Sequence, residues 1–144
     1  MSSSNRALRT AVLVSGGGTN LQSIIDERDA GRLDIDICGV FSDRADAFGL
    51  ERARRAGVPA QAVPYRDYAS RKQAEYALIE ALADSQPELV VLAGFMRILP
   101  AVGVETYRGR MLNVHPSLLP KYRGLNTFRR VLDAGDAWHG TTVH

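Results

Sequence analysis

Short runs of consecutive apolar residues alternate along this chain with longer segments in which apolar residues recur every three or four positions. Consecutive apolar residues are typical of strands buried on both faces of a parallel sheet, whereas the longer period is typical of helices that bury one face. The expected strands are 10–15, 36–42, 60–63, 89–93, 112–115 and 141–144, and the expected helices are 20–30, 45–56, 67–85 and 125–134. The run 89–93 is the most apolar, so we expect it at the centre of the sheet.

This alternation of strands with helices predicts an α/β fold, a mostly parallel, Rossmann-like sheet with helices on both faces. A length of 144 residues suits one domain, so we expect residues 1–144 to form a single domain. In such sheets, ligands bind outside the carboxyl ends of the strands. The loops that follow the strands are therefore the expected places for a functional site.

Composition narrows the classes of function. A hydrophobic fraction of 45% and a charged fraction of 24% indicate a folded globular protein and exclude disordered and collagen-like chains. The net charge of +2 is too small to indicate nucleic-acid binding. Basic residues spread over several segments are expected to form a solvated surface; these are Arg52, Arg54, Arg55, Lys121, Arg123, Arg129 and Arg130.

Neither a disulfide framework nor a membrane segment is expected. Cys38 is the single cysteine of the sequence, so an intrachain disulfide is excluded, and no Cys/His/Asp grouping has the spacing of metal ligands. The longest apolar run, 89–96, is too short to span a bilayer, and 11–14 is too short for a signal-peptide core. A cytoplasmic location is therefore expected.

The loop after the first expected strand contains three successive glycines, Gly16 to Gly18, followed by Thr19 and Asn20. Glycines allow a ligand to approach the backbone closely, and the following helix offers unpaired N–H groups and a positive dipole end, which together favour an anion such as phosphate. The alternative is a flexible turn in which Thr19 or Asn20 caps the helix. The loop is a poor dinucleotide fingerprint, because Leu21 stands where the third glycine would fall.

Two further loops could carry chemistry. Asn113 and His115 alternate along an expected strand and so share one side of it at a carboxyl end. An amide that stabilises an oxyanion and a histidine that moves a proton suit carbonyl chemistry, although a hydrogen-bonded histidine closing a strand fits the pattern equally well. The loop 94–100 could hold a flat heterocycle between apolar side chains, or could be plain core packing with a solvated Arg97.

Four segments carry a strong resemblance to the glycinamide ribonucleotide formyltransferases of purine biosynthesis. They are Ser-Gly-Gly-Gly-Thr-Asn-Leu-Gln at 15–22, Phe-Ser-Asp-Arg-Ala-Asp-Ala at 41–47, Leu-Ala-Gly-Phe-Met-Arg-Ile-Leu at 92–99 and Asn-Val-His-Pro-Ser-Leu-Leu-Pro-Lys-Tyr at 113–122. The resemblance covers almost the whole chain from residue 8, and the Asn-x-His-Pro-Ser-Leu-Leu-Pro block is specific to folate-dependent formyltransferases. It implies the formyltransferase version of the α/β fold.

The resemblance also implies a reaction, in which the amine of glycinamide ribonucleotide attacks the formyl carbon of 10-formyltetrahydrofolate, with no metal. It implies that Asn113 donates to the oxyanion, that His115 carries the proton and that His144 has a supporting role. The residues implied for the substrate phosphate are Gly18, Thr19 and Asn20, and those implied for the folate are Arg71, Met96, Arg97, Ile98, Leu99 and Asn113.

The sequence departs from the family pattern near its end. The resemblance implies a catalytic aspartate a few residues beyond His144, which would pair with His115 and raise its pKa. We therefore expect residues 1–144 to be a catalytic domain that is incomplete at its C-terminus and impaired in activity. Asn126 and Phe128 stand where relatives often carry histidines, and Phe128 would remove a polar group from the rim of the site.

Two other functions stay open. A formyltetrahydrofolate hydrolase of the same fold would use water in place of the amine. An inactive, truncated nucleotide-binding module would bind phosphate without transferring a formyl group. In each case the expected partners are small molecules, with no nucleic acid and no membrane, and the oligomeric state is left open.

Overall fold

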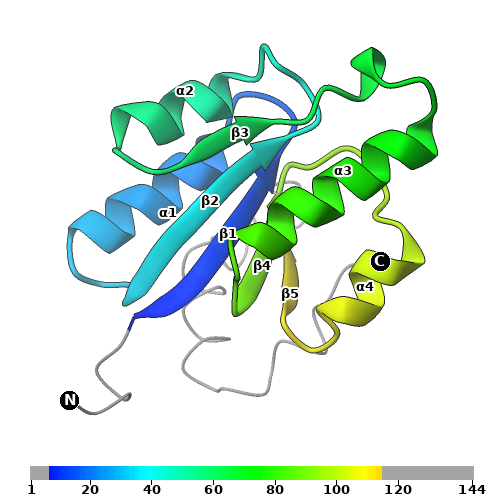
Figure 1. Ribbon diagram of the computed structural model, residues 1–144. Helices are drawn as coiled ribbons and strands as arrows, with labels where there is room; N and C mark the ends of the chain where they lie inside the picture. Colours follow the sequence, from blue (N-terminus) through cyan, green and yellow to red (C-terminus); the bar gives the residue numbers. More distant parts are fainter. Residues whose placement is uncertain (1–6, 115–144) are drawn as a thin grey trace.

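The computed structural model of the protein describes residues 7–114, which form a parallel five-stranded sheet between two layers of helices (Figure 1). The strands are β1 (Leu8–Val14), β2 (Ile35–Ser42), β3 (Ala60–Ala62), β4 (Leu89–Ala93) and β5 (Met111–Val114). The helices are α1 (Thr19–Asp29), α2 (Phe48–Arg55), α3 (Arg71–Asp84) and α4 (Ala101–Thr106), with a 3-10 turn, η2 (Tyr65–Asp67), before α3. The predicted α/β architecture is confirmed.

The strand order is β3-β2-β1-β4-β5, and every pair of neighbours is parallel. β1, not β4, lies in the middle of the described sheet, whereas the sequence predicted the centre for 89–93. All five residues of β4 are buried because β4 lies between β1 and β5, with helices on both faces. This order brings the ends of β2, β1 and β4 side by side.

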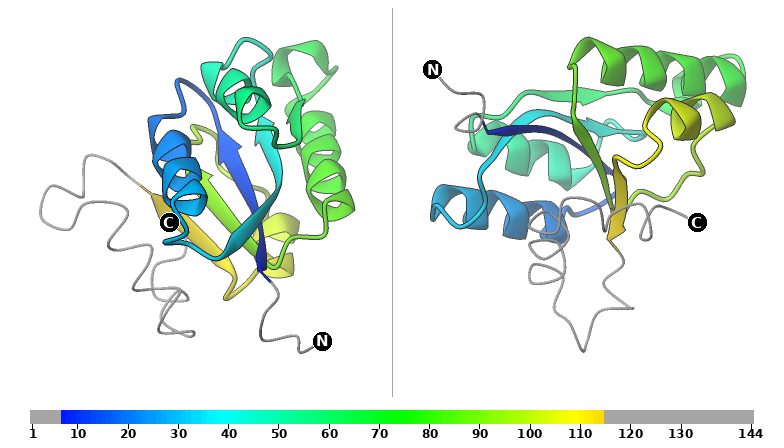
Figure 2. Two further views of the ribbon diagram at one scale, coloured as in Figure 1. Left: turned by 90° about the vertical axis from the view of Figure 1, so that its left-hand side faces the viewer. Right: turned by 90° about the horizontal axis from the view of Figure 1, so that it is seen from below.

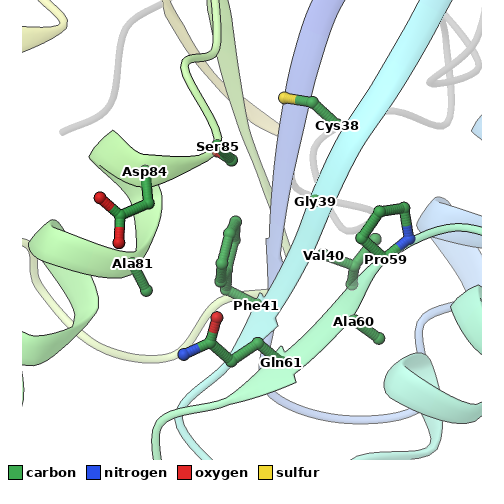
Figure 3. A pocket seen from close by; sticks show the side chains of 10 residues that line it. All are labelled: Cys38, Gly39, Val40, Phe41, Pro59, Ala60, Gln61, Ala81, Asp84 and Ser85. Atoms are coloured by element: carbon green, nitrogen blue, oxygen red, sulfur yellow. The ribbon is translucent and has the colours of Figure 1, made fainter.

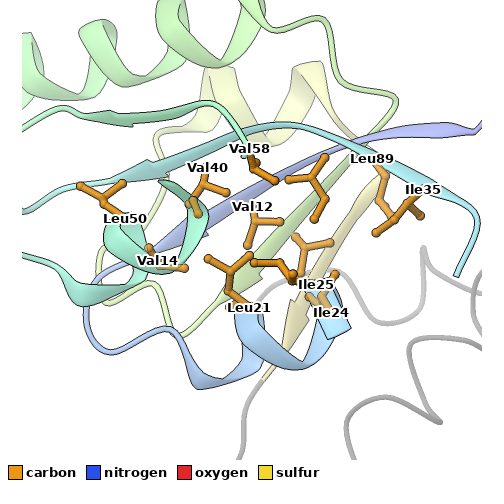
Figure 4. Close-up of a cluster of buried hydrophobic side chains, with 14 of the residues drawn as sticks. Val12, Val14, Leu21, Ile24, Ile25, Ile35, Val40, Leu50, Val58 and Leu89 are labelled. Atoms are coloured by element: carbon orange, nitrogen blue, oxygen red, sulfur yellow. The ribbon is translucent and has the colours of Figure 1, made fainter. Parts of the chain in front are cut away.

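Helices cover both faces of the sheet (Figure 2), and each face carries its own hydrophobic core. Val12 and Val14 of β1 point to the face covered by α1 and α2, where they meet Leu21, Ile25 and Leu50 (Figure 4). Ala11 and Leu13 point to the opposite face, which α3 and α4 cover. Because successive side chains of a strand point to opposite faces, a strand buried on both faces needs consecutive apolar residues.

The helix boundaries differ from the predictions where capping decides them. The helix expected from residue 67 begins at Arg71, because the Ser70 hydroxyl accepts a hydrogen bond from the Gln73 backbone N–H at 3.2 Å. Residues 65–67 form the 3-10 turn instead. The six-residue helix α4 was not predicted; it begins directly after Pro100, whose own amide has no proton to leave unpaired.

Several predicted elements lie outside the described residues. β5 spans Met111–Val114, and His115, the last residue of the strand expected here, lies outside the described residues. The helix expected at 125–134 and the strand expected at 141–144 also fall beyond it. Within residues 7–114, no helix is both long enough and apolar enough to span a bilayer.

Candidate functional site

The loops that follow β1, β2 and β4 surround a hollow of about 380 Å³ at the carboxyl edge of the sheet. It is lined by Ser15 and Gly16 after β1, by Asp43 and Arg44 after β2, and by Gly94, Met96 and Arg97 after β4. This is the edge at which parallel α/β sheets bind their ligands. Two of the loops that the sequence singled out, 15–21 and 94–100, therefore meet at one place.

The glycine-rich loop leads directly into the N-terminus of α1. Gly18 is the N-cap residue, with a φ of 75°, and no side chain caps the helix. The alternative in which Thr19 or Asn20 caps the helix is therefore wrong, because both residues lie inside the first turn. A helix terminus without a side-chain cap presents its first backbone N–H groups to a ligand, as an anion site requires.

Helix α2 holds this loop in place through very close backbone contact. The Gly49 N–H donates to the Gly16 carbonyl oxygen at 3.0 Å. A Cβ atom on Gly18 would lie 2.6 Å from the Gly49 Cα, and a Cβ atom on Gly49 would lie 2.8 Å from a methyl group of Val14. Two glycines in contact thus let the loop and the helix approach more closely than side chains would permit.

Arg52, one turn after Gly49 on α2, adds a side-chain contact to the same loop. Its Nε donates to the Gly17 carbonyl oxygen at 2.6 Å, and its Nη1 donates to the Gln22 side-chain oxygen at 3.3 Å. The guanidinium also lies over the Phe48 ring, 5.0 Å from its centroid. The sequence predicted a solvated arginine here. The i, i+3 spacing of Gly49 and Arg52 is a possible signal, although it identifies no partner by itself.

A hydrogen-bond network centred on the buried Asp43 joins the three loops at the wall of the hollow. The Ser15 hydroxyl donates to one carboxylate oxygen of Asp43 at 2.6 Å, and the Arg97 Nε donates to the other at 2.8 Å. The Ser15 hydroxyl also accepts a hydrogen bond from the Met96 backbone N–H at 2.8 Å. Sequence reasoning quoted Asp43 only as part of a motif and missed this role, because the partners lie 28 and 54 positions away.

The loop after β4 divides its side chains between solvent and core. Met96 and Ile98 are 81% and 88% exposed, so their side chains are available as apolar walls for a ligand. Leu99 is buried in the core on the α3 face, so its side chain cannot provide such a wall. Any ligand contact by Leu99 would have to use its backbone.

The remaining predicted site residues occupy different surroundings. Arg71, the first residue of α3, has a largely exposed side chain that forms an ion pair with Glu75 at 3.4 Å. Asn113 lies half-buried on β5, in register with Leu92 of β4. His115 and His144 lie outside the described residues. Of the predicted site residues, Met96 and Arg97 line the hollow, whereas Gly18, Thr19 and Asn20 lie beside it at the start of α1. Asn113 lies one strand further along the sheet.

Tyr65 lies beneath the guanidinium of Arg97, whose central carbon is 4.6 Å from the ring centroid. Burial raises the pKa of Tyr65 to about 12, with a smaller contribution from the negative charges of Glu75 and Asp43, while Arg97 and Arg71 lower it. Within residues 7–114, the Tyr65 hydroxyl oxygen is buried without a hydrogen-bond partner. The ring therefore packs against the Arg97 guanidinium. Because its pKa is raised, the phenol stays protonated at neutral pH.

A second hollow, of about 240 Å³, lies between β2, β3 and the C-terminal end of α3 (Figure 3). It contains Cys38, Phe41, Gln61 and Asp84, and none of the predicted site residues lines it. Burial is the main cause that raises the pKa of the Cys38 thiol, which keeps the sulfur protonated and a poor nucleophile. In the described part of the chain, no three His, Cys, Asp or Glu side chains gather closely enough to hold a metal ion.

Comparison with known proteins shows which proteins this chain is similar to. The family model for formyl transferases matches residues 8–144. The chain is 49% identical over 137 residues to a phosphoribosylglycinamide formyltransferase of Escherichia coli, and this match covers 95% of the chain and 65% of that protein. It is 44% identical over 143 residues to a trifunctional purine biosynthetic protein of Drosophila melanogaster, covering 98% of the chain and 11% of that protein.

A solved structure extends the likeness to three dimensions. The phosphoribosylglycinamide formyltransferase of Coxiella burnetii superimposes with a TM-score of 0.74 at 50% sequence identity, covering 91% of this chain and 62% of that one. The chain thus spans a little under two thirds of the length of the relatives named phosphoribosylglycinamide formyltransferase. With a family match over nearly all of its residues and the same fold, the chain belongs to the formyl transferase family.

Proposed function

We propose that the protein transfers a formyl group from 10-formyltetrahydrofolate to the amine of glycinamide ribonucleotide in de novo purine biosynthesis. The observation that carries this proposal is the meeting of the glycine-rich loop and the loop after β4 at one hollow, where the Met96 N–H and the Ser15 hydroxyl are 2.8 Å apart. The names of the similar proteins support the same activity, and one of them is named as a purine biosynthetic protein.

In this proposal the ribonucleotide phosphate binds at the N-terminus of α1. Gly18, Thr19 and Asn20 offer backbone N–H groups there, and the helix dipole adds a partial positive charge. Thr19 is exposed and Asn20 is half-exposed, so both side chains can reach a bound anion. The sugar and the amine would then extend over the hollow toward the loop after β4.

The folate lies against the loop after β4. Met96 and Ile98 cover its ring system, while Arg97 and Leu99 contribute backbone groups that can hydrogen-bond a heterocycle. The exposed Arg71 supplies a positive charge for a carboxylate of the ligand, in place of its present ion pair with Glu75. Asn113, on the neighbouring β5, faces the formyl group in this arrangement.

The chemistry of the proposal needs only hydrogen bonding and proton transfer. As the amine nitrogen attacks the formyl carbon, negative charge develops on the formyl oxygen, and a preorganised Asn113 amide N–H stabilises it. His115 carries a proton between the attacking amine and the departing folate nitrogen, and His144 supports it. The bond between the formyl carbon and the folate nitrogen then breaks. The roles of His115 and His144 in this proposal rest on the family resemblance.

Isothermal titration calorimetry of the chain with glycinamide ribonucleotide and with a non-reactive folate analogue tests the proposal. We expect both ligands to bind, and binding of neither would contradict it. Formyl transfer is then measured with and without the ribonucleotide. Release of formate that does not depend on the amine would instead support a hydrolase. The expectations that the partners are small molecules, with no nucleic acid and no membrane, and that the protein is cytoplasmic stay predictions.

Substitution of His115 tests the assigned proton transfer. In a form of the protein that includes the aspartate implied beyond His144, His115→Ala should lower turnover about 100-fold or more, because a positioned general acid–base group contributes about that much. The affinity for the ribonucleotide, measured by calorimetry, should stay close to that of the unchanged protein. Unchanged turnover would remove His115 from the proposed mechanism.

A further inference from the structure

Among the described residues, Asp43 is the only charged residue whose side chain is buried; it is 4% exposed. Removing a carboxylate from water is unfavourable by several kcal/mol unless hydrogen bonds and a counter-charge compensate. Both are present here, since the Ser15 hydroxyl and the Arg97 guanidinium each bind one carboxylate oxygen. The position of this charge, in the wall of the hollow, suggests a task beyond stability.

The partners of Asp43 belong to the two loops assigned to the two substrates. Ser15 directly precedes the glycine-rich loop, and Arg97 lies in the loop after β4. The Ser15 hydroxyl connects them a second time, because it donates to Asp43 and accepts from the Met96 N–H. Asp43 is itself held in place, as its carbonyl oxygen accepts from the Tyr65 N–H at 3.1 Å.

We propose that Asp43 is a positioning residue that holds the loop after β4 against the loop after β1, and so keeps the phosphate subsite and the folate subsite at one spacing. The identity of the two ligands rests on the proposed function, whereas the positioning of the loops does not. Group transfer requires the reacting atoms to lie about 3–3.5 Å apart, and a misplacement of about 1 Å can cost about 100-fold in rate. A fixed spacing between the subsites therefore has a direct chemical use.

Amide hydrogen exchange tests the positioning without any ligand. In Asp43→Asn, an NH₂ group that cannot accept a hydrogen bond replaces one of the two carboxylate oxygens, so either Ser15 or Arg97 loses its acceptor and the loop after β4 loses one anchor. We expect the Met96 amide of the full chain to exchange about tenfold faster or more, while the Val91 amide in the middle of β4 changes less. Equal acceleration at Met96 and Val91, or no change at Met96, would overturn the proposal.

Asp46→Asn is the matched control. Asp46 lies three residues further along the same loop, its side chain is 73% exposed, and it pairs with Arg44 at 3.3 Å. The same chemical change there should leave exchange at Met96 as it is in the unchanged chain. If Asp43→Asn does not fold, Ser15→Ala removes one hydroxyl from the network and serves as a milder variant, which should weaken binding of the folate analogue; unchanged binding in that variant would also overturn the proposal.

Calorimetry then separates this inference from the proposed function. The folate analogue is titrated into the unchanged chain and into Asp43→Asn, each with and without saturating glycinamide ribonucleotide. We expect Asp43→Asn to bind the analogue about tenfold more weakly and to lose any benefit from the bound ribonucleotide. Equal affinities in the two chains would overturn the positioning role alone. If the unchanged chain binds neither ligand, the proposed function fails, and the exchange experiment still decides the role of Asp43.

Discussion

The two loops at the carboxyl edge of the sheet are held in opposite ways. The loop after β1 is shaped by missing side chains, because Gly18 and Gly49 let two backbones touch. The loop after β4 is shaped by side chains that are present, since Asp43 binds Arg97 and Ser15 binds the Met96 backbone. Adding an atom at Gly18 should therefore damage the first loop, whereas removing an atom from Asp43 or Ser15 should damage the second. In the proposed function, the backbone N–H groups of the first loop need open space for a phosphate, while the apolar wall of the second needs a fixed support.

Gly18→Ala should have the largest effect on the free energy of unfolding. A small effect would contradict the idea that the loop after β1 depends on a missing side chain. Alanine at a φ of 75° is strained, and its Cβ would lie 2.6 Å from backbone that cannot move aside easily. We expect the free energy of unfolding to fall by about 2–4 kcal/mol, measured by urea denaturation. Gly17→Ala is the control, since a Cβ there meets nothing within 4 Å.

Arg52→Ala should have a medium effect that is confined to the glycine-rich loop. The substitution removes the bonds from the guanidinium to Gly17 and Gln22. We expect the affinity for glycinamide ribonucleotide to fall about five- to tenfold, with no change in the affinity for the folate analogue, both measured by calorimetry.

Arg55→Ala is the control for Arg52→Ala. Arg55 lies over the same Phe48 ring, at 5.3 Å, but pairs with Glu51 instead of the loop. It should therefore bind both ligands as the unchanged chain does. Equal losses in the two variants would mean that α2 contributes only general positive charge, and the contact with Gly17 would have no role of its own.

Tyr65→Phe should have the smallest effect on the free energy of unfolding. It tests whether the ring or the hydroxyl of Tyr65 supports the loop after β4. The hydroxyl has no partner in the described part of the chain, so its removal should change the free energy of unfolding by less than about 1 kcal/mol at neutral pH. The packing of the ring under Arg97 is retained. A large loss of stability in this variant would mean that the hydroxyl, and not the ring, supports the loop.

Tyr65→Phe should also change how the free energy of unfolding depends on pH. The pKa of Tyr65 is about 12 in the folded protein, above the value of about 10 for an exposed tyrosine. The folded state therefore holds this proton more tightly, so its contribution to stability is complete below about pH 10 and is lost as the pH rises toward 12. Unfolding measured across this range should show a steeper loss in the unchanged chain than in Tyr65→Phe, and exposed Tyr76→Phe should behave like the unchanged chain.

The sequence was informative where local patterns decide the structure. Apolar runs such as 89–93 located the strands, because burial on both faces of a sheet demands them. The three glycines before Thr19 marked the loop that caps α1 without a side chain, because few other residues adopt a φ of 75°. The family resemblance, carried by four motifs, is confirmed by the match over residues 8–144.

The predictions that failed share one physical cause, which is packing between residues that lie far apart in the chain. The Leu99 side chain was expected among the apolar walls of the loop 94–100, but the core on the α3 face buries it. Arg52 was expected in solvent, but the closeness of Gly18 and Gly49 brings it onto the loop. The roles proposed for His115 and His144 stay predictions, because both residues lie outside the described part of the chain.

The sequence by itself determined the alternation of strands and helices, the position of the glycine-rich loop and the family, because each of these depends on residues close together in the chain. Only the tertiary structure decided that β1 lies between β2 and β4, and that Asp43 meets Ser15 and Arg97. Strand order depends on how crossover helices pack, and a buried hydrogen bond depends on three strand ends arriving together. Neither leaves a periodic signal along the chain, so a composition-based reading treats a buried, paired aspartate like one on the surface.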